Sequence, residues 1–201
     1  NSQYQSVVLL ISGGFLLAFQ DSLVKYAAEW TSFWQFQTLR SIFNLFLLVI
    51  VPPLFGIKLS KLLPKNIIMV ILRTFFLVLC MFFFFCAAPK LSVAEMATGL
   101  YTYPIFVVIF AFLFLKEKIT FLKFSALFFG VVGASFVLKP WSADFSFFQI
   151  FPVLAGFFYA CNLFVLRKFC SNESPLAMTA TVAVFFIFSG GFGIIFTDYF
   201  N

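Results

Sequence analysis

The 201-residue chain is 63% hydrophobic and only 10% charged, and its mean hydropathy is +1.09. A soluble domain of this length cannot bury so much apolar surface in one core, so we expect an all-α integral membrane protein. The net charge of +6 does not indicate nucleic-acid binding, because the basic residues lie in short gaps between apolar runs.

Histidine is absent from the chain, which excludes histidine-based general base catalysis and histidine metal sites. The four cysteines lie in or beside apolar runs without CxxC spacing, so we interpret them as buried hydrophobic residues. We therefore expect no cofactor, no metal site and no enzyme activity.

About 20 apolar residues are needed to cross a bilayer, and the sequence divides at that length into seven predicted spans. The gaps between them are too short to hold a soluble domain. The predicted spans are residues 6–28, 34–55, 66–88, 92–115, 119–138, 147–169 and 176–197.

The first two spans carry polar residues at depth, where an ionisable group is costly and is a functional candidate. In the second span, Gln37, Arg40 and Asn44 share one helix face, with Arg40 roughly 10 Å inside the span. We predict that this stripe faces a central cavity in which Arg40 binds a substrate carboxylate. Asp21 in the first span is a further candidate. The alternatives are structural: an Arg40–Asp21 pair, or an Asp21–Lys25 pair.

Four further candidates lie in the third and fourth spans. Arg73 enters the third span from the opposite side to a comparable depth, unless its long stem reaches back to the interface. Glu95 begins the fourth span and either binds a substrate cation or a proton, or favours the helix N-terminus. Tyr101 and Tyr103 lie deeper, beside Pro104, which we expect to kink this helix.

Small residues at a spacing of four, around Gly14 in the first span and Gly130 in the fifth, predict close helix packing there. The sixth span repeats part of the first: residues 14–25 resemble residues 156–167, and Gln20 is aligned with Asn162. Five spans separate the two segments, so the second copy enters from the opposite side, as in inverted-repeat transporters.

This similarity between residues 14–25 and 156–167, which we call the internal echo, predicts a bundle of inverted five-helix repeats with the second repeat truncated. The first repeat would be residues 1–139, and residues 147–201 would begin the second. A homodimer that completes the second repeat is an arrangement that the sequence leaves open.

Positively charged loops predict that the N-terminus lies in the cytoplasm and that the protein resides in the plasma (inner) membrane. The predicted cytoplasmic loops carry the lysines and arginines at positions 58, 61, 65, 116, 118, 167 and 168.

Several motifs occur in a recognisable order: PKLSVAE at residues 89–95, Tyr103-Pro104, FLKEKIT at residues 114–120, then Gly130 and Gly133. Together with Arg40 and Leu72-Arg73, they resemble the EamA domain of the drug/metabolite transporter superfamily. The resemblance implies ten helices, a cytoplasmic N-terminus and transport of small organic solutes without ATP hydrolysis. Arg73 and the 91–95 segment are most similar to the branch that includes S-adenosylmethionine carriers.

The sequence thus favours secondary-active transport of a small metabolite, either amino-acid-like or S-adenosylmethionine-like. The alternative is a non-catalytic membrane assembly or channel subunit. The expected partners are the lipid bilayer and a small-molecule substrate.

Overall fold

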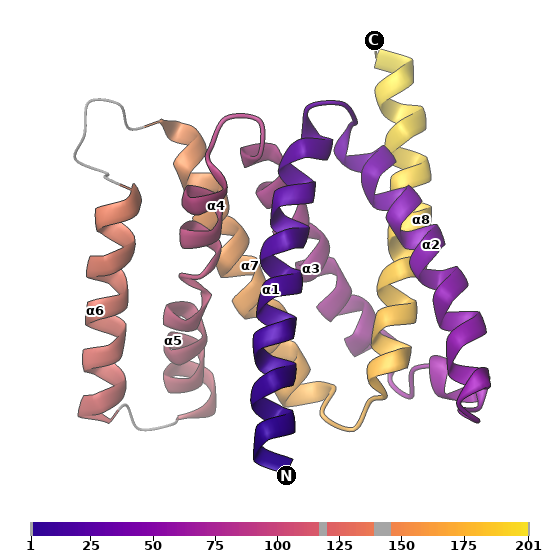
Figure 1. Ribbon diagram of the computed structural model, residues 1–201, viewed down its shortest axis with the longest axis horizontal. Coiled ribbons are helices and arrows are strands. Elements are labelled where there is room, and N and C mark those ends of the chain that lie inside the picture. Colours follow the sequence, from indigo (N-terminus) through magenta and orange to yellow (C-terminus); the bar gives the residue numbers. More distant parts are fainter. Residues whose placement is uncertain (1, 117–119, 139–145, 201) are drawn as a thin grey trace.

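The computed structural model describes residues 2–116, 120–138 and 146–200, and it is helical throughout apart from turns and short connections (Figure 1). The α-helices are α1 (Ser2–Ala28), α2 (Phe33–Leu54), α3 (Ile67–Ala87), α4 (Val93–Leu100), α5 (Tyr103–Leu115), α6 (Phe121–Leu138), α7 (Ile150–Phe169) and α8 (Pro175–Phe200). Two short 3₁₀ helices, η1 (Leu59–Leu62) and η2 (Phe147–Gln149), lie before α3 and α7.

The helices run side by side and alternate in direction, with α4 and α5 together forming one passage across the bundle (Figure 1). Five helical segments of the described residues are long and apolar enough to cross a membrane, and α6 adds a shorter apolar segment. The prediction of a polytopic, all-helical membrane protein is confirmed. The five segments are Phe33–Leu54, Ile67–Ala87, Val93–Phe114, Phe147–Phe169 and Pro175–Ile195.

The fourth passage is broken rather than merely bent. α4 ends at Leu100 and α5 begins at Tyr103, with Pro104 in its first turn. Proline has no N–H, so the carbonyl four residues earlier, that of Leu100, loses its helical partner. The predicted interruption of this span at Pro104 is confirmed, with the break lying just before the proline.

Glycine allows α7 to approach this break. A Cβ built on Gly156 of α7 would lie 2.8 Å from the Leu100 carbonyl oxygen. On the other side of the contact, a Cβ on Gly99 would lie 2.6 Å from Pro152 Cβ. Both distances are too short for a side chain, so the contact between α4 and α7 depends on glycine at both positions.

The two most extensive contacts between helices are those of α3 with α7 and of α2 with α8. On α8, a Cβ at Gly190 would collide with Thr38, and a Cβ at Gly193 with the Trp34 ring, so these glycines set the approach of α2. Phenylalanine rings also fill space between helices; for example, Phe83 of α3 stacks on Phe158 of α7 with ring centroids 5.5 Å apart.

Among the described residues, no neighbouring helix lies against Gly14 or Gly130, the glycines of the two predicted small-residue stripes. A Cβ built on Gly14 of α1 or Gly130 of α6 would meet nothing within 4 Å in the described structure. Spacing alone identifies a small-residue stripe, but it does not say whether a neighbouring helix faces that stripe.

α1 and α7, the helices that contain the internal echo, run in opposite directions (Figure 1). This is the relation that an inverted repeat requires. The division of the chain into two repeats remains a prediction.

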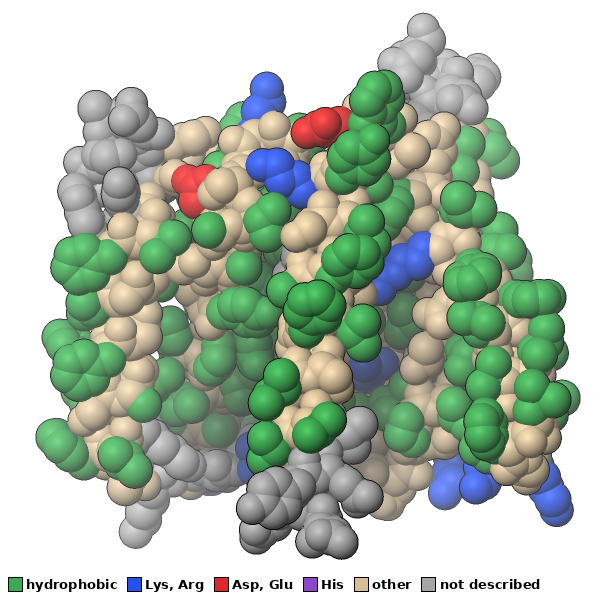
Figure 2. All heavy atoms as spheres, in the orientation of Figure 1, with side chains coloured by type: hydrophobic (Ala, Val, Ile, Leu, Met, Phe, Trp, Pro, Cys, Tyr) green, Lys and Arg blue, Asp and Glu red, His purple; other side chains and the backbone are tan. Residues whose placement is uncertain are grey.

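The basic loops gather at one end of the bundle. The α2–α3 connection, the end of α5, the start of α6 and the end of α7 all lie at the lower end in Figure 1. Figure 2 shows blue Lys and Arg side chains at this end and both red and blue side chains at the upper end. The charge asymmetry inferred from the sequence is therefore also an asymmetry of the structure.

Candidate functional site

A polar contact joins α1 and α2 in the interior of the bundle. Arg40 of α2 donates from Nη2 to Oε1 of Gln20 on α1 over 3.1 Å. Gln37 lies one turn earlier on α2 and is only 3% exposed. The three side chains line a small cavity of about 20 Å³, whose remaining walls are apolar side chains of α1, α2, α3 and α4. This volume holds about one water molecule, so the cavity is closed in this conformation.

Only part of the polar stripe predicted on α2 lines this cavity. Gln37 and Arg40 line it, whereas Asn44 is half-buried and is not among its lining residues. The side chain of Asp21 lies outside the described residues, and Lys25 donates to the Leu91 carbonyl oxygen over 2.9 Å.

Arg73 lies on α3, toward the opposite end of the bundle from Arg40. It is half-buried, and its Nε and Nη1 atoms are shielded from solvent without a hydrogen-bond partner in the described structure. Tyr159 of α7 lies within range of an electrostatic interaction with Arg73. Asn162, one turn further along α7, is 1% exposed, and its Oδ1 likewise has no partner among the described residues.

The two tyrosines beside the α4–α5 break have different environments. Tyr103 packs edge-on against Tyr159, with ring centroids 4.9 Å apart. Tyr101 is 53% exposed and lies within range of an electrostatic interaction with Tyr159. Tyr103 and Tyr159 therefore join the break to the region around Arg73.

Glu95 lies at the upper end, at the start of α4. Its carboxylate accepts hydrogen bonds from the Ser92 backbone N–H at 2.9 Å, the Ser92 hydroxyl at 2.6 Å and Gln149 Nε2 at 3.0 Å. The Ser92 contacts form a capping box, which the S-x-x-E pattern of the sequence signals. The carboxylate thus caps α4 and ties it to the start of α7.

A second carboxylate ties the lower end together. Glu173, between α7 and α8, accepts the backbone N–H groups of Lys65 and Asn66 at 2.9 and 2.7 Å, just before α3. These two hydrogen bonds hold the pKa of Glu173 below its ordinary value. Nothing in the sequence connects Glu173 with residues more than 100 positions away, and sequence reasoning missed this contact.

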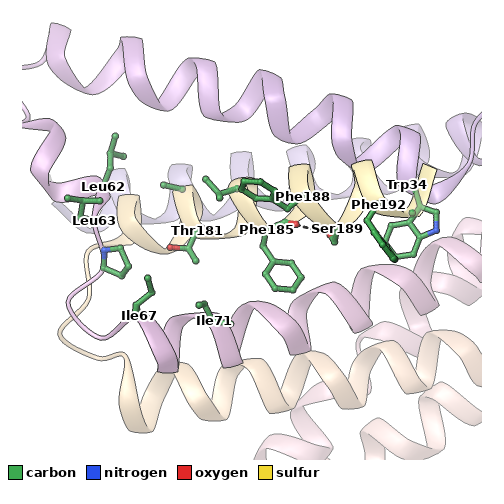
Figure 3. Close-up of a pocket in the computed structure, with 14 residues that line it drawn as sticks. Trp34, Leu62, Leu63, Ile67, Ile71, Thr181, Phe185, Phe188, Ser189 and Phe192 are labelled. Atoms are coloured by element: carbon green, nitrogen blue, oxygen red, sulfur yellow. Dashed lines mark hydrogen bonds between the residues drawn. The ribbon is translucent and has the colours of Figure 1, made fainter. Parts of the chain in front are cut away.

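A much larger groove of about 740 Å³ lies between α2, η1, α3 and α8 (Figure 3). Its walls are mostly apolar and include Trp34, Phe185, Phe188 and Phe192. The hydroxyls of Thr181 and Ser189 point to it, but each donates to a carbonyl of its own helix. The groove therefore offers apolar contact and few free hydrogen-bonding groups.

Polar side chains occur inside the bundle as well as at its two ends. Figure 2 shows blue Lys or Arg side chains inside the hollow beside α1, away from both ends of the bundle. Gln20, Gln37 and Arg40 line the small cavity, whereas Arg73 and Asn162 bury polar atoms elsewhere in the bundle. Within the described residues, no three Cys, Asp or Glu side chains lie together as a metal site.

Sequence reasoning missed Gln20 and Asn162 as members of the interior polar set, although the internal echo aligned them with each other. Both are amides inside apolar helices, and that was the available signal.

Comparison with known proteins adds family information. The model of the EamA-like transporter family matches residues 5–139. The chain is 37% identical over 79 residues to a riboflavin transporter of Vibrio cholerae and 31% identical over 83 residues to one of Brucella anthropi. A riboflavin transporter of Rhizobium johnstonii is 28% identical over 83 residues.

These matches cover 39%, 41% and 41% of this chain and 26%, 29% and 28% of the relatives' own lengths, respectively. The chain therefore matches less than a third of each of these relatives. No solved structure matches it significantly.

Proposed function

This chain belongs to the EamA-like transporter family, and on that premise we propose that it carries a small neutral metabolite of the flavin type across a membrane. Three relatives named as riboflavin transporters support the substrate class. The observation that carries the proposal within the chain is its interior set of amide and guanidinium groups, which is surrounded by aromatic rings.

Riboflavin combines a flat aromatic ring system with an imide edge and a hydroxylated side chain, and it has no carboxylate. Amides can both donate to and accept from such groups, and Arg can donate to ring carbonyls or stack on the ring. In this proposal Arg40 and Arg73 act as hydrogen-bond donors rather than as partners of a substrate charge.

We place the solute among these polar groups rather than in the large apolar groove. The imide and hydroxyl groups of a flavin need hydrogen-bond partners when they leave water, and leaving them without partners weakens binding. The hydroxyls of Thr181 and Ser189 in the groove already donate within α8. The closed cavity beside Arg40 requires that helices move apart to admit the solute, as alternating access demands.

We further propose that the end carrying the α2–α3 connection and the end of α7 faces the cytoplasm of an inner membrane, because positive charge is retained on that side. The proposal involves no covalent chemistry. It also places the N-terminus in the cytoplasm.

Growth of a riboflavin-auxotrophic bacterium that lacks its own uptake system tests the substrate. Cells producing the protein should grow on low micromolar riboflavin and should accumulate labelled riboflavin, whereas cells with an empty vector should not. Excess unlabelled riboflavin should compete with uptake.

Competition with other solutes separates the alternatives. Uptake of S-adenosylmethionine or an amino acid in place of riboflavin would contradict the flavin assignment. It would instead support binding of a substrate carboxylate by Arg40. Membrane insertion without uptake of any of these solutes would favour the assembly-subunit alternative.

A further inference from the structure

Two side chains between α3 and α7 bury polar atoms that lack partners in the described structure. They are Arg73, through Nε and Nη1, and Asn162, through Oδ1. Buried polar atoms are nearly always hydrogen-bonded, so each exception requires a reason. On α3, the N–H donors of Arg73 have no acceptor. On α7, the side-chain oxygen of Asn162 has no donor.

The packing brings these side chains to the same level. α3 and α7 run in opposite directions (Figure 1), and Val70 and Val165 belong to one buried cluster. Arg73 follows Val70 by three residues on α3, and Asn162 precedes Val165 by three residues on α7. Both steps lead in the same direction, by about 4.5 Å along the helix axis.

A second pair of an arginine and an amide side chain occurs elsewhere in the bundle, and in that pair the two side chains are hydrogen-bonded to each other. Gln20, which the internal echo aligns with Asn162, accepts a hydrogen bond from Arg40 over 3.1 Å. Both helices of the echo thus carry an amide at the level of an arginine on a neighbouring helix. In the first pair the arginine donates to the amide, and in the second pair the donors and the acceptor are open.

We propose that Arg73 and Asn162 form a subsite for the imide or lactam edge of a neutral heterocycle, a reading that rests on the proposed flavin transport. Such an edge offers a carbonyl oxygen to Arg73 and an N–H to Asn162 Oδ1. A carboxylate or phosphate could accept from Arg73, but it would leave the Asn162 oxygen facing another acceptor. Tyr159 and Tyr103 provide aromatic surface next to the subsite.

Riboflavin and 3-methylriboflavin test this subsite, because the methyl group removes the imide N–H and leaves the ring system intact. In uptake assays the wild-type protein should prefer riboflavin by about tenfold, the size expected for one unmet buried hydrogen bond. Asn162→Leu should transport riboflavin less well and should abolish the preference. The preference is a ratio within each variant, so it does not depend on the amount of protein in the membrane.

Thr74→Val is the matched control. Thr74 is fully buried beside Arg73, but its hydroxyl donates to the Val70 carbonyl of its own helix over 2.7 Å. This variant should keep the wild-type preference. Asn162→Ser is a second test if Asn162→Leu does not accumulate, and it should reduce the preference.

Three results would overturn the subsite. One is a wild-type protein that transports both flavins equally. Another is an unchanged preference in Asn162→Leu or Asn162→Ser. The third is faster uptake of 3-carboxymethylriboflavin than of riboflavin, with that advantage lost in Arg73→Gln, since it would identify an anion site. Absence of riboflavin uptake by the wild-type protein would instead contradict the proposed function itself.

Discussion

Arg40 and Gln20 connect α1 to α2 at a point where a guanidinium cannot be left without partners. A double-mutant cycle measures this connection. Arg40→Ala and Gln20→Ala should each lower the unfolding free energy of the protein in detergent by about 1–3 kcal/mol, because each removes a half-buried hydrogen bond to a charged guanidinium. The double variant should lose clearly less than the sum of the two, by about 0.5–3 kcal/mol of coupling.

Arg40→Lys separates charge from geometry in the same assay. Lysine keeps the positive charge but loses the planar fork, so it should recover only part of the stability and of the flavin uptake. Additive single effects would show that Arg40 is not coupled to Gln20. Wild-type uptake by Arg40→Ala would show that Arg40 is not needed for transport.

Glu173 makes a pH-dependent contribution to stability. Its pKa is lowered in the folded protein by the N–H groups of Lys65 and Asn66. A lowered pKa means that the stabilisation is present above the ordinary glutamate value of about 4.5 and is lost as the pH falls below it. At pH 7, Glu173→Gln should therefore have a lower Tm than wild type, and the difference should shrink as the pH approaches 3. A Tm difference that stays constant from pH 7 to pH 3 would contradict this account.

At the residue scale, the sequence located side chains along each helix better than it identified their partners. The spacing of Gln37 and Arg40 predicted a shared face, and both line one cavity. The contact of Arg40 with Gln20 depends on how α1 is rotated against α2, and the residue pattern of a single helix does not contain that rotation. The roles predicted for the candidate residues remain predictions.

At the scale of elements, glycine sets the contact between α2 and α8. Gly190→Ala should destabilise the protein by about 1–3 kcal/mol, because the added methyl group collides with Thr38 and the helices must separate. Gly191→Ala is the matched control, since a Cβ there meets nothing within 4 Å. Thermal unfolding in detergent compares the two, and equal Tm values for both variants would contradict the proposed contact.

Helix breaks and caps could be predicted because their causes are local. Pro104 removes a backbone donor, and Ser92 with Glu95 forms a capping box within four residues. The packing of α3 on α7 could not be predicted from the sequence, because it joins two apolar segments that are far apart in the chain.

At the scale of the whole molecule, the distribution of charged loops predicts the orientation in the membrane. In a variant without native cysteines, Lys90→Cys at the upper end should react with an impermeant thiol reagent in intact cells. Lys61→Cys in η1 should react only after the cells are permeabilised. Labelling of Lys61→Cys but not of Lys90→Cys in intact cells would reverse the orientation.

The measurement that tests the central claim most directly is riboflavin counterflow in liposomes that contain only the purified protein. Liposomes preloaded with unlabelled riboflavin should take up labelled riboflavin transiently above its equilibrium level. This should occur without ATP, because exchange through an interior polar site needs no other energy source. Entry of label at the rate of protein-free liposomes would contradict the account.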